Sequence, residues 1–136
     1  MTGIFNAIDS AASGVTVDRK WMDAVSDNIS NINTARRTSE NAFQARYVVA
    51  QAVDYGSGAG GVQVGGIALG DAQGRVVSDP DNPLADADGN VRMPDIDLGS
   101  EMTQLIMAQR GYQANLKVVE AAQESYQGAI SVGRGV

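Results

Sequence analysis

The chain has 136 residues, a formal net charge of −6, and neither cysteine nor histidine. Its length fits one domain with helical extensions, while the missing residue types exclude disulfide scaffolds, thiol nucleophiles and cysteine-ligated metal centres, and remove the commonest general base. The ten basic residues are too scattered for a phosphate-binding stripe, so nucleic-acid binding is not expected, and no apolar run approaches the roughly 20 residues of a membrane span.

Residues 1–34 predict a long N-terminal helix with a narrow apolar stripe. The apolar positions alternate between steps of four and three residues, which is the coiled-coil spacing and keeps one face directed at a partner helix. Asp18 alone breaks the stripe. The stripe consists of Ile4, Ile8, Ala11, Val15, Asp18, Met22, Val25, Ile29 and Ile32.

An asparagine-rich cluster closes this helix. Asn28, Asn31 and Asn33, followed by Thr34, are poor helix formers whose amides both donate and accept hydrogen bonds. Two interpretations stay open. The cluster is either a fraying helix end, or a set of amides that bond between packed helices of neighbouring subunits and so fix their register.

Residues 35–96 predict a small antiparallel β or irregular domain, because they hold every proline and most of the glycines. A meander is expected to continue from 67–69 into 75–77 through a turn at 71–74. The expected strands are 43–53, 62–64, 67–69, 75–77 and 91–93.

A cluster of carboxylates before the last helix raises the question of a metal site. Asp86, Asp88 and Gly89 fit part of a calcium-binding loop, but Leu84 occupies the position of the first acidic ligand and Asp95 replaces the bidentate glutamate. A polar turn is therefore expected, with no metal and no other cofactor. A carboxylate-dependent hydrolase that uses these three aspartates is the enzymatic alternative.

Residues 97–136 predict a second long helix, with Asp97 as its N-cap. Its stripe contains several alanines and the polar Asn115, so a lone two-helix hairpin would bury little apolar area, and several helices per seam fit better. The plainer alternative is an ordinary helical bundle with surface loops. The stripe consists of Leu98, Met102, Leu105, Ala108, Tyr112, Asn115, Val119, Ala122, Tyr126 and Ala129. The predicted class is α+β, with long N- and C-terminal helices paired as a coiled-coil-like bundle around a small antiparallel β domain.

Three stretches carry a resemblance to a known family. Residues 28–34 (NISNINT) resemble the signature near the N-terminus of the bacterial flagellar rod and hook proteins, and residues 111–118 (GYQANLKV) resemble their C-terminal signature. Residues 82–97 are similar to the members that build the proximal rod. The resemblance implies a structural, non-enzymatic subunit of the flagellar basal body, whose paired terminal helices form an inner tube and whose middle segment projects outward.

The same resemblance implies the partners and the location. The partners are other rod proteins and further copies of this chain in a helical tube, together with the flagellar type III export apparatus, which carries the unfolded chain without a cleaved signal peptide to the periplasm-spanning rod. No nucleic acid, small-molecule substrate or direct membrane insertion is expected. The alternative is a helical adaptor or binding module that docks one partner at fixed stoichiometry.

Subunit contacts are expected along both stripes and at the two signatures. The expected interface residues are Ile4, Ile8, Val15, Met22, Val25, Asn28, Ile29, Asn31, Ile32, Asn33, Thr34, Met102, Leu105, Tyr112, Gln113, Asn115, Val119 and Tyr126.

Overall fold

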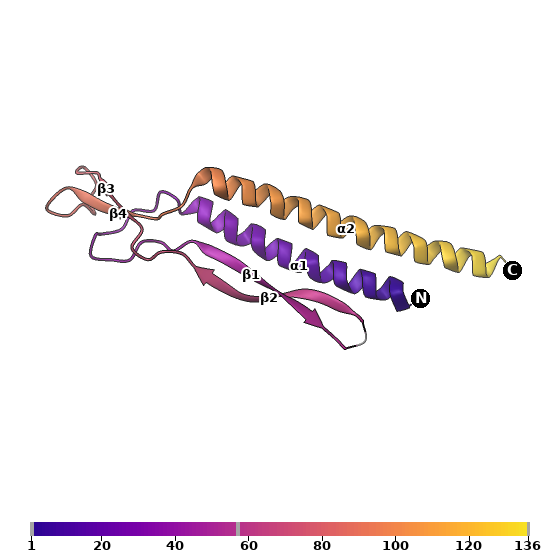
Figure 1. Ribbon diagram of the computed structural model, residues 1–136. Coiled ribbons are helices and arrows are strands. Elements are labelled where there is room, and N and C mark those ends of the chain that lie inside the picture. The colour runs from indigo at the N-terminus through magenta and orange to yellow at the C-terminus, as the bar shows by residue number, and fades with distance from the viewer. Residues whose placement is uncertain (1, 57, 136) are drawn as a thin grey trace.

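The computed structural model describes residues 2–56 and 58–135 and shows an elongated molecule built on two antiparallel helices (Figure 1). The elements in chain order are α1 (Thr2–Ser30), β1 (Arg46–Asp54), β2 (Gly60–Leu69), β3 (Arg75–Ser78), β4 (Asn90–Met93) and α2 (Leu98–Arg134). Long terminal helices thus flank a small antiparallel β region, which confirms the predicted α+β class.

Helix α1 lies in the middle of the molecule. Figure 1 shows α2 along one side of it and the β1–β2 ribbon along the other, with β3 and β4 at the end remote from both termini. In the described chain the ribbon packs on α1 and not on α2. The helix pair therefore keeps one long side that the rest of the chain leaves uncovered.

The ribbon consists of two long strands with one irregularity. The predicted strands 62–64 and 67–69 are a single strand, β2, which pairs antiparallel with β1 from Arg46 opposite Leu69 to Asp54 opposite Gly60. The ladder shifts where Gly65 has no residue opposite it, so β2 absorbs one extra residue as a bulge. The bulge falls at residues 65 and 66, between the two strands that were expected to be separate.

The predicted meander from 67–69 to 75–77 is wrong. Strand β3 pairs instead with β4, with Arg75 opposite Met93 and Ser78 opposite Asn90, in a separate two-stranded sheet. The turn at 71–74 does not close a hairpin between β2 and β3. It leads the chain out of the ribbon and into the sheet at the end of the molecule.

The buried face of α1 is rotated from the predicted stripe. The buried residues are Ala11, Gly14, Val17, Ala24, Val25 and Asn28, and of these only Ala11 and Val25 belong to the stripe. The other stripe positions are half-buried. The rotation arises because α1 is covered on two sides, by α2 and by the ribbon, and a stripe calculated for one partner helix does not include the second contact.

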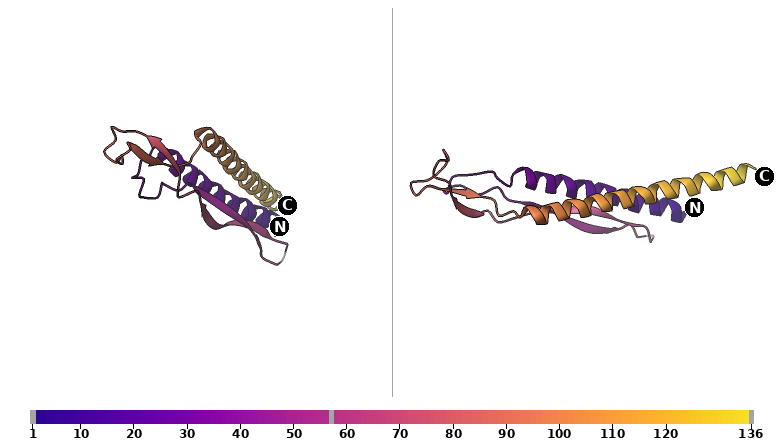
Figure 2. Two further views of the ribbon diagram at one scale, coloured as in Figure 1. Left: turned by 60° about the vertical axis from the view of Figure 1, so that its left-hand side comes forward. Right: turned by 90° about the horizontal axis from the view of Figure 1, so that it is seen from above.

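Helix α2 begins as predicted and is only lightly buried. The carboxylate of Asp97 accepts a hydrogen bond from the Ser100 backbone N–H at 2.7 Å, which confirms the N-cap. Along the whole helix only Glu101 and Ala108 are buried. Seen from above, its C-terminal end continues beyond the start of α1 (Figure 2). Neither described helix is long and apolar enough to cross a membrane.

Candidate assembly interface

The predicted contact residues of α1 form a row along one side of the helix. Ile8, Val15, Met22 and Ile29 recur every seven residues, so their side chains lie on one face of the helix. All four, together with Ile4 before them, are half-buried in the described chain. Each keeps apolar surface in contact with solvent that a neighbouring molecule could cover.

The predicted contact residues of α2 form a matching row. Leu105, Tyr112, Val119 and Tyr126 also recur every seven residues and are half-buried, while Met102 is exposed. Gln113 is exposed as well. Further large apolar side chains of α2 are at least a third exposed, namely Leu98, Ile106, Met107, Leu116, Val118, Ile130 and Val132. A helix this apolar and this exposed has no adequate partner within its own chain.

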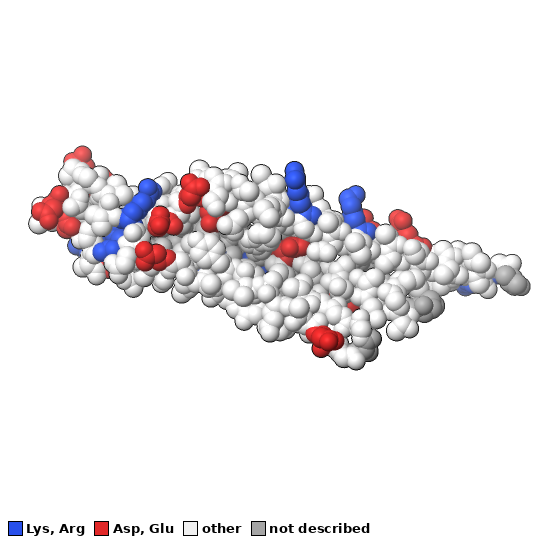
Figure 3. Space-filling model, viewed as in Figure 1, with Lys and Arg blue, Asp and Glu red and all other residues white. Residues whose placement is uncertain are grey.

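The charge distribution favours the same surface. On the face drawn in Figure 3, Asp and Glu side chains gather towards the end that carries β3 and β4, while uncharged surface covers much of the helices and the ribbon and a few Lys and Arg side chains project from the helix edge. Depletion of charge is typical of the centre of a protein–protein interface. The surface of the helix pair is therefore better suited to protein contact than the tip, which is the end of the molecule that carries β3 and β4.

Two of the predicted interface residues lie inside the chain. Val25 is 1% exposed and Asn28 is 0% exposed, so neither presents surface to another molecule, and their assignment to a subunit contact is corrected. The Asn28 side chain bonds to Arg46, where Nδ2 donates to the backbone oxygen at 3.0 Å and Oδ1 accepts from the backbone N–H at 2.8 Å. Nδ2 also donates to Glu101 Oε2 at 3.1 Å.

The rest of the asparagine cluster ends the helix. Asn31 Nδ2 donates to the Asp27 backbone oxygen at 2.8 Å, and the Thr34 hydroxyl donates to Asn31 Oδ1 at 3.2 Å. Asn33 is exposed and Ile32 is half-buried in the turn that follows Ser30. The amides of Asn28 and Asn31 thus bond within the chain; the expectation of bonds to a neighbouring subunit is wrong for the buried Asn28, and for the half-buried Asn31 it stays a prediction.

The two polar breaks in the stripes meet each other. Asn115 Nδ2 donates to Asp18 Oδ2 at 2.9 Å across the helix pair. Glycines permit this approach, because a Cβ at Gly14 would lie 2.5 Å from Asn115 Nδ2 and one at Gly111 would lie 3.0 Å from the Asp18 carboxylate oxygens. The stripes identified both polar residues, but only the fold shows that they are partners.

Contacts at both ends hold the helices in register. Near the α1 N-terminus, the rings of Phe5 and Tyr126 meet edge to face with centroids 5.6 Å apart. Towards the other end, the Trp21 indole N–H donates to Gln104 Oε1 at 3.3 Å. Neither contact was predicted, because Phe5, Trp21 and Gln104 lie off the stripes.

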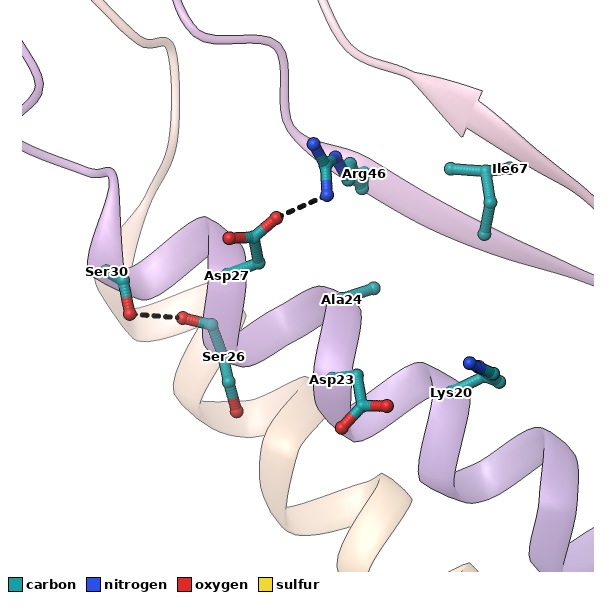
Figure 4. Close-up of a pocket in the computed structure, with 8 residues that line it drawn as sticks. All are labelled: Lys20, Asp23, Ala24, Ser26, Asp27, Ser30, Arg46 and Ile67. Carbon is teal, nitrogen blue, oxygen red and sulfur yellow. Dashed lines mark hydrogen bonds and ion pairs between the residues drawn. The ribbon is translucent and has the colours of Figure 1, made fainter.

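An open pocket of about 550 Å³ lies between α1 and the ribbon (Figure 4). Arg46 Nη1 pairs with Asp27 Oδ2 at 2.6 Å on one wall, and Lys20 and Asp23 bring one further charge of each sign. The pocket is also lined by Ala24, Ser26, Ser30 and Ile67. The pocket lining therefore carries two charges of each sign.

Of the three carboxylates that raised the hydrolase alternative, that of Asp86 is used in hydrogen bonds within its own loop, whereas Asp88 and Asp95 are exposed. Asp86 Oδ1 accepts the backbone N–H groups of Asp88 and Asn90 at 3.0 and 2.9 Å, and Oδ2 accepts the Thr38 hydroxyl at 2.8 Å. The hydrogen bond from the Asn90 backbone, together with the one from Thr38, lowers the pKa of Asp86 below its ordinary value. No group of three acidic side chains placed to hold a metal ion occurs in residues 2–56 and 58–135.

Comparison with known proteins gives one consistent result. The family model described as the C-terminal part of the flagellar basal-body rod FlgEFG proteins matches residues 87–132, which cover the end of the tip and most of α2. The chain is 32% identical to the flagellar basal-body rod protein FlgC of Salmonella typhimurium, over 96% of this chain and 98% of that protein. Proteins of the same name from Aquifex aeolicus and Bacillus subtilis are 34% and 29% identical, over 93% and 96% of this chain and 95% and 98% of theirs.

Proposed function

Since the chain belongs to the family of flagellar basal-body rod proteins FlgC, we propose that it is a structural subunit of the flagellar rod, and that it assembles through the uncovered side of the α1–α2 pair. The subunit performs no chemical step. Its function is to present the same surfaces in every copy, so that neighbours add in a repeating arrangement.

The observation that carries the proposed contact is the pair of half-buried apolar rows. Ile8, Val15 and Met22 on α1 and Leu105 and Tyr112 on α2 are each only partly covered by their own chain. Burying such side chains contributes roughly 25 cal/mol for each Å² removed from water. When the surfaces that meet are different, repeated contact produces an open helical assembly if the rotation between neighbours does not close into a ring.

We propose in addition that residues 1–34 and 97–136 form the inner tube and that residues 35–96 project outward. The similarity of residues 82–97 to the proximal members of the family supports a place in the proximal rod. Export of the unfolded chain through the flagellar type III apparatus, into a rod that spans the periplasm, follows from the same resemblance. The partners in this proposal are neighbouring rod proteins and further copies of this chain.

The test compares one substitution at two places. Val15→Glu puts a charge into the α1 row, whereas Val76→Glu puts it on β3, at a position 57% exposed and remote from the helix pair. Each variant is expressed in a strain that lacks the native protein, its level is checked by immunoblot, and completed rods are counted by electron microscopy. We expect Val15→Glu to reduce rods at least about tenfold, since a buried unpaired charge is costly, and Val76→Glu to leave them normal.

Normal rods with Val15→Glu would show that this row is not the contact surface. A rod that forms normally in the strain without the protein would exclude the structural role itself. An adaptor of fixed stoichiometry would be revealed by a discrete complex of this chain with one partner and no extended assembly.

A further inference from the structure

We propose that Asn28 is a latch through which α2 controls the docking of the β1–β2 ribbon on α1. Asn28 is in the last turn of α1 and is completely buried. Its side-chain amide pairs with both the N–H and the C=O of Arg46, the first residue of β1. The amide thus pairs with the edge of the ribbon as a neighbouring strand would.

The other side of the same amide is held by α2. Glu101, in the first turn of α2, is 3% exposed, and its Oε2 accepts from Asn28 Nδ2 at 3.1 Å. An asparagine amide has two N–H donors and one carbonyl acceptor, and here Nδ2 has an acceptor on β1 and another on α2 while Oδ1 accepts from β1. One side chain therefore joins α1, β1 and α2.

Glu101 acts on β1 only through Asn28, which makes it a positioning residue. If the amide were flipped, Oδ1 would face both Glu101 Oε2 and the Arg46 carbonyl oxygen, and Nδ2 would face the Arg46 N–H, so all three contacts would be repulsive. Glu101 therefore reinforces the orientation that the Arg46 backbone also requires.

The latch is complete only when the helices pair. Glu101 belongs to α2 and lies 73 residues after Asn28 in the sequence, so it reaches its place only when α2 packs against α1. Until then Asn28 is open to water on its α2 side, and its bonds to Arg46 compete with hydration. Pairing of the helices closes the site and fixes the ribbon, so that the ribbon is held firmly only in a subunit whose α2 is in place.

The experiment measures amide hydrogen exchange of the full chain by NMR, with the Arg46 amide as the reporter. We expect Glu101→Ala to speed exchange at Arg46 at least about tenfold, because Asn28 then loses the acceptor on α2 that holds its amide in place and shields it from water. Exchange at Val25, an α1 amide close to the latch, should change less than threefold. Glu101→Gln, which keeps an acceptor oxygen, should restore most of the protection at Arg46.

The matched control is Gln104→Ala, less than one turn further along α2. This change removes the hydrogen bond from Trp21 of α1 to Gln104 of α2 and leaves the contacts of Asn28 intact. The exchange rate of the Arg46 amide should therefore stay within about twofold of that in the unmodified chain. In an Asn28→Ala background, Glu101→Ala should have no further effect on Arg46, because the residue that connects them is absent.

Three results would overturn the proposal. Unchanged exchange at Arg46 in Glu101→Ala would show that α2 does not act on the ribbon. An equal acceleration in Gln104→Ala would show that any weakening of the helix pair has the same effect. An unprotected Arg46 amide in the unmodified chain would show that the latch does not form.

Discussion

The contact between Asp18 and Asn115 explains why two apolar stripes each carry one polar residue. Either side chain alone in a helix–helix seam would lose its hydrogen bonds to water without replacement, which costs about 1–3 kcal/mol. Together they satisfy each other at 2.9 Å, and Gly14 leaves the space in which the Asn115 amide lies. Because the bond joins one position on α1 to one on α2, it opposes sliding of the helices past each other.

Asn115→Leu should destabilise the isolated subunit. Leucine has the same number of side-chain heavy atoms as asparagine but is bulkier and offers no donor to Asp18, so the free energy of unfolding should fall by at least about 1 kcal/mol. Urea unfolding followed by circular dichroism measures the change, with Gln113→Leu, at an exposed neighbouring position, as the control. Equal midpoints for Asn115→Leu and the unmodified chain would mean that the hydrogen bond to Asp18 contributes nothing to stability.

At the level of elements, the helices could be predicted from the sequence and the strand pairing could not. Periodic apolar residues, the Asp97 cap and the confinement of proline to the middle segment all act locally. The pairing of β3 with β4 depends on contacts between distant segments, and the rotated face of α1 depends on the ribbon that packs beside it. The apolar stripe, derived for a single partner helix, therefore predicted the position of α1 in the sequence but not which of its sides is the most buried.

Protection against hydrogen exchange should decrease along the helix pair from the end at Asn28 and Glu101 towards the C-terminal end of α2. The buried side chains of α1 run from Ala11 to Asn28, and those of α2 are Glu101 and Ala108. Past Tyr126, α2 continues beyond its last aromatic contact with α1. Backbone hydrogen bonds with few packed neighbours open readily, so amides around Val25 and Ala108 should exchange slowest and those of 128–134 fastest.

Exchange of the full chain followed by mass spectrometry after peptic digestion tests this gradient. Peptides from 128–134 should be fully deuterated at the first time point, while those around 101–108 should still be protected. Equal protection along all of α2 would contradict the prediction and would indicate that the helix is stable without a partner.

For the whole molecule, the apolar rows could be predicted from the sequence more successfully than the partners of the polar residues beside them. Both heptad rows are half-buried, as expected for side chains that keep surface for a neighbour. The partner of Asn28 could not be predicted from the sequence, because a polar residue at the end of a helix looks the same in the sequence whether it bonds to another subunit or to its own chain. Only the position of Arg46 and Glu101 beside it, 18 and 73 residues away in sequence, decides between the two.

Self-association of the purified chain should increase with salt. Each subunit carries a net charge of −6, so identical copies repel one another at low ionic strength, and this repulsion is screened over about 10 Å at 0.1 M salt and about 3 Å at 1 M. The attraction between apolar rows does not weaken under the same conditions. Sedimentation velocity at 0.02 M and 0.5 M sodium chloride should therefore show a shift to larger, concentration-dependent species at the higher salt.

Val15→Glu, which interrupts the α1 row, should remain monomeric at both salt concentrations. Association that weakens as salt rises would show that ion pairs rather than apolar contacts join the subunits, and would contradict the assignment of the helix-pair surface as the contact.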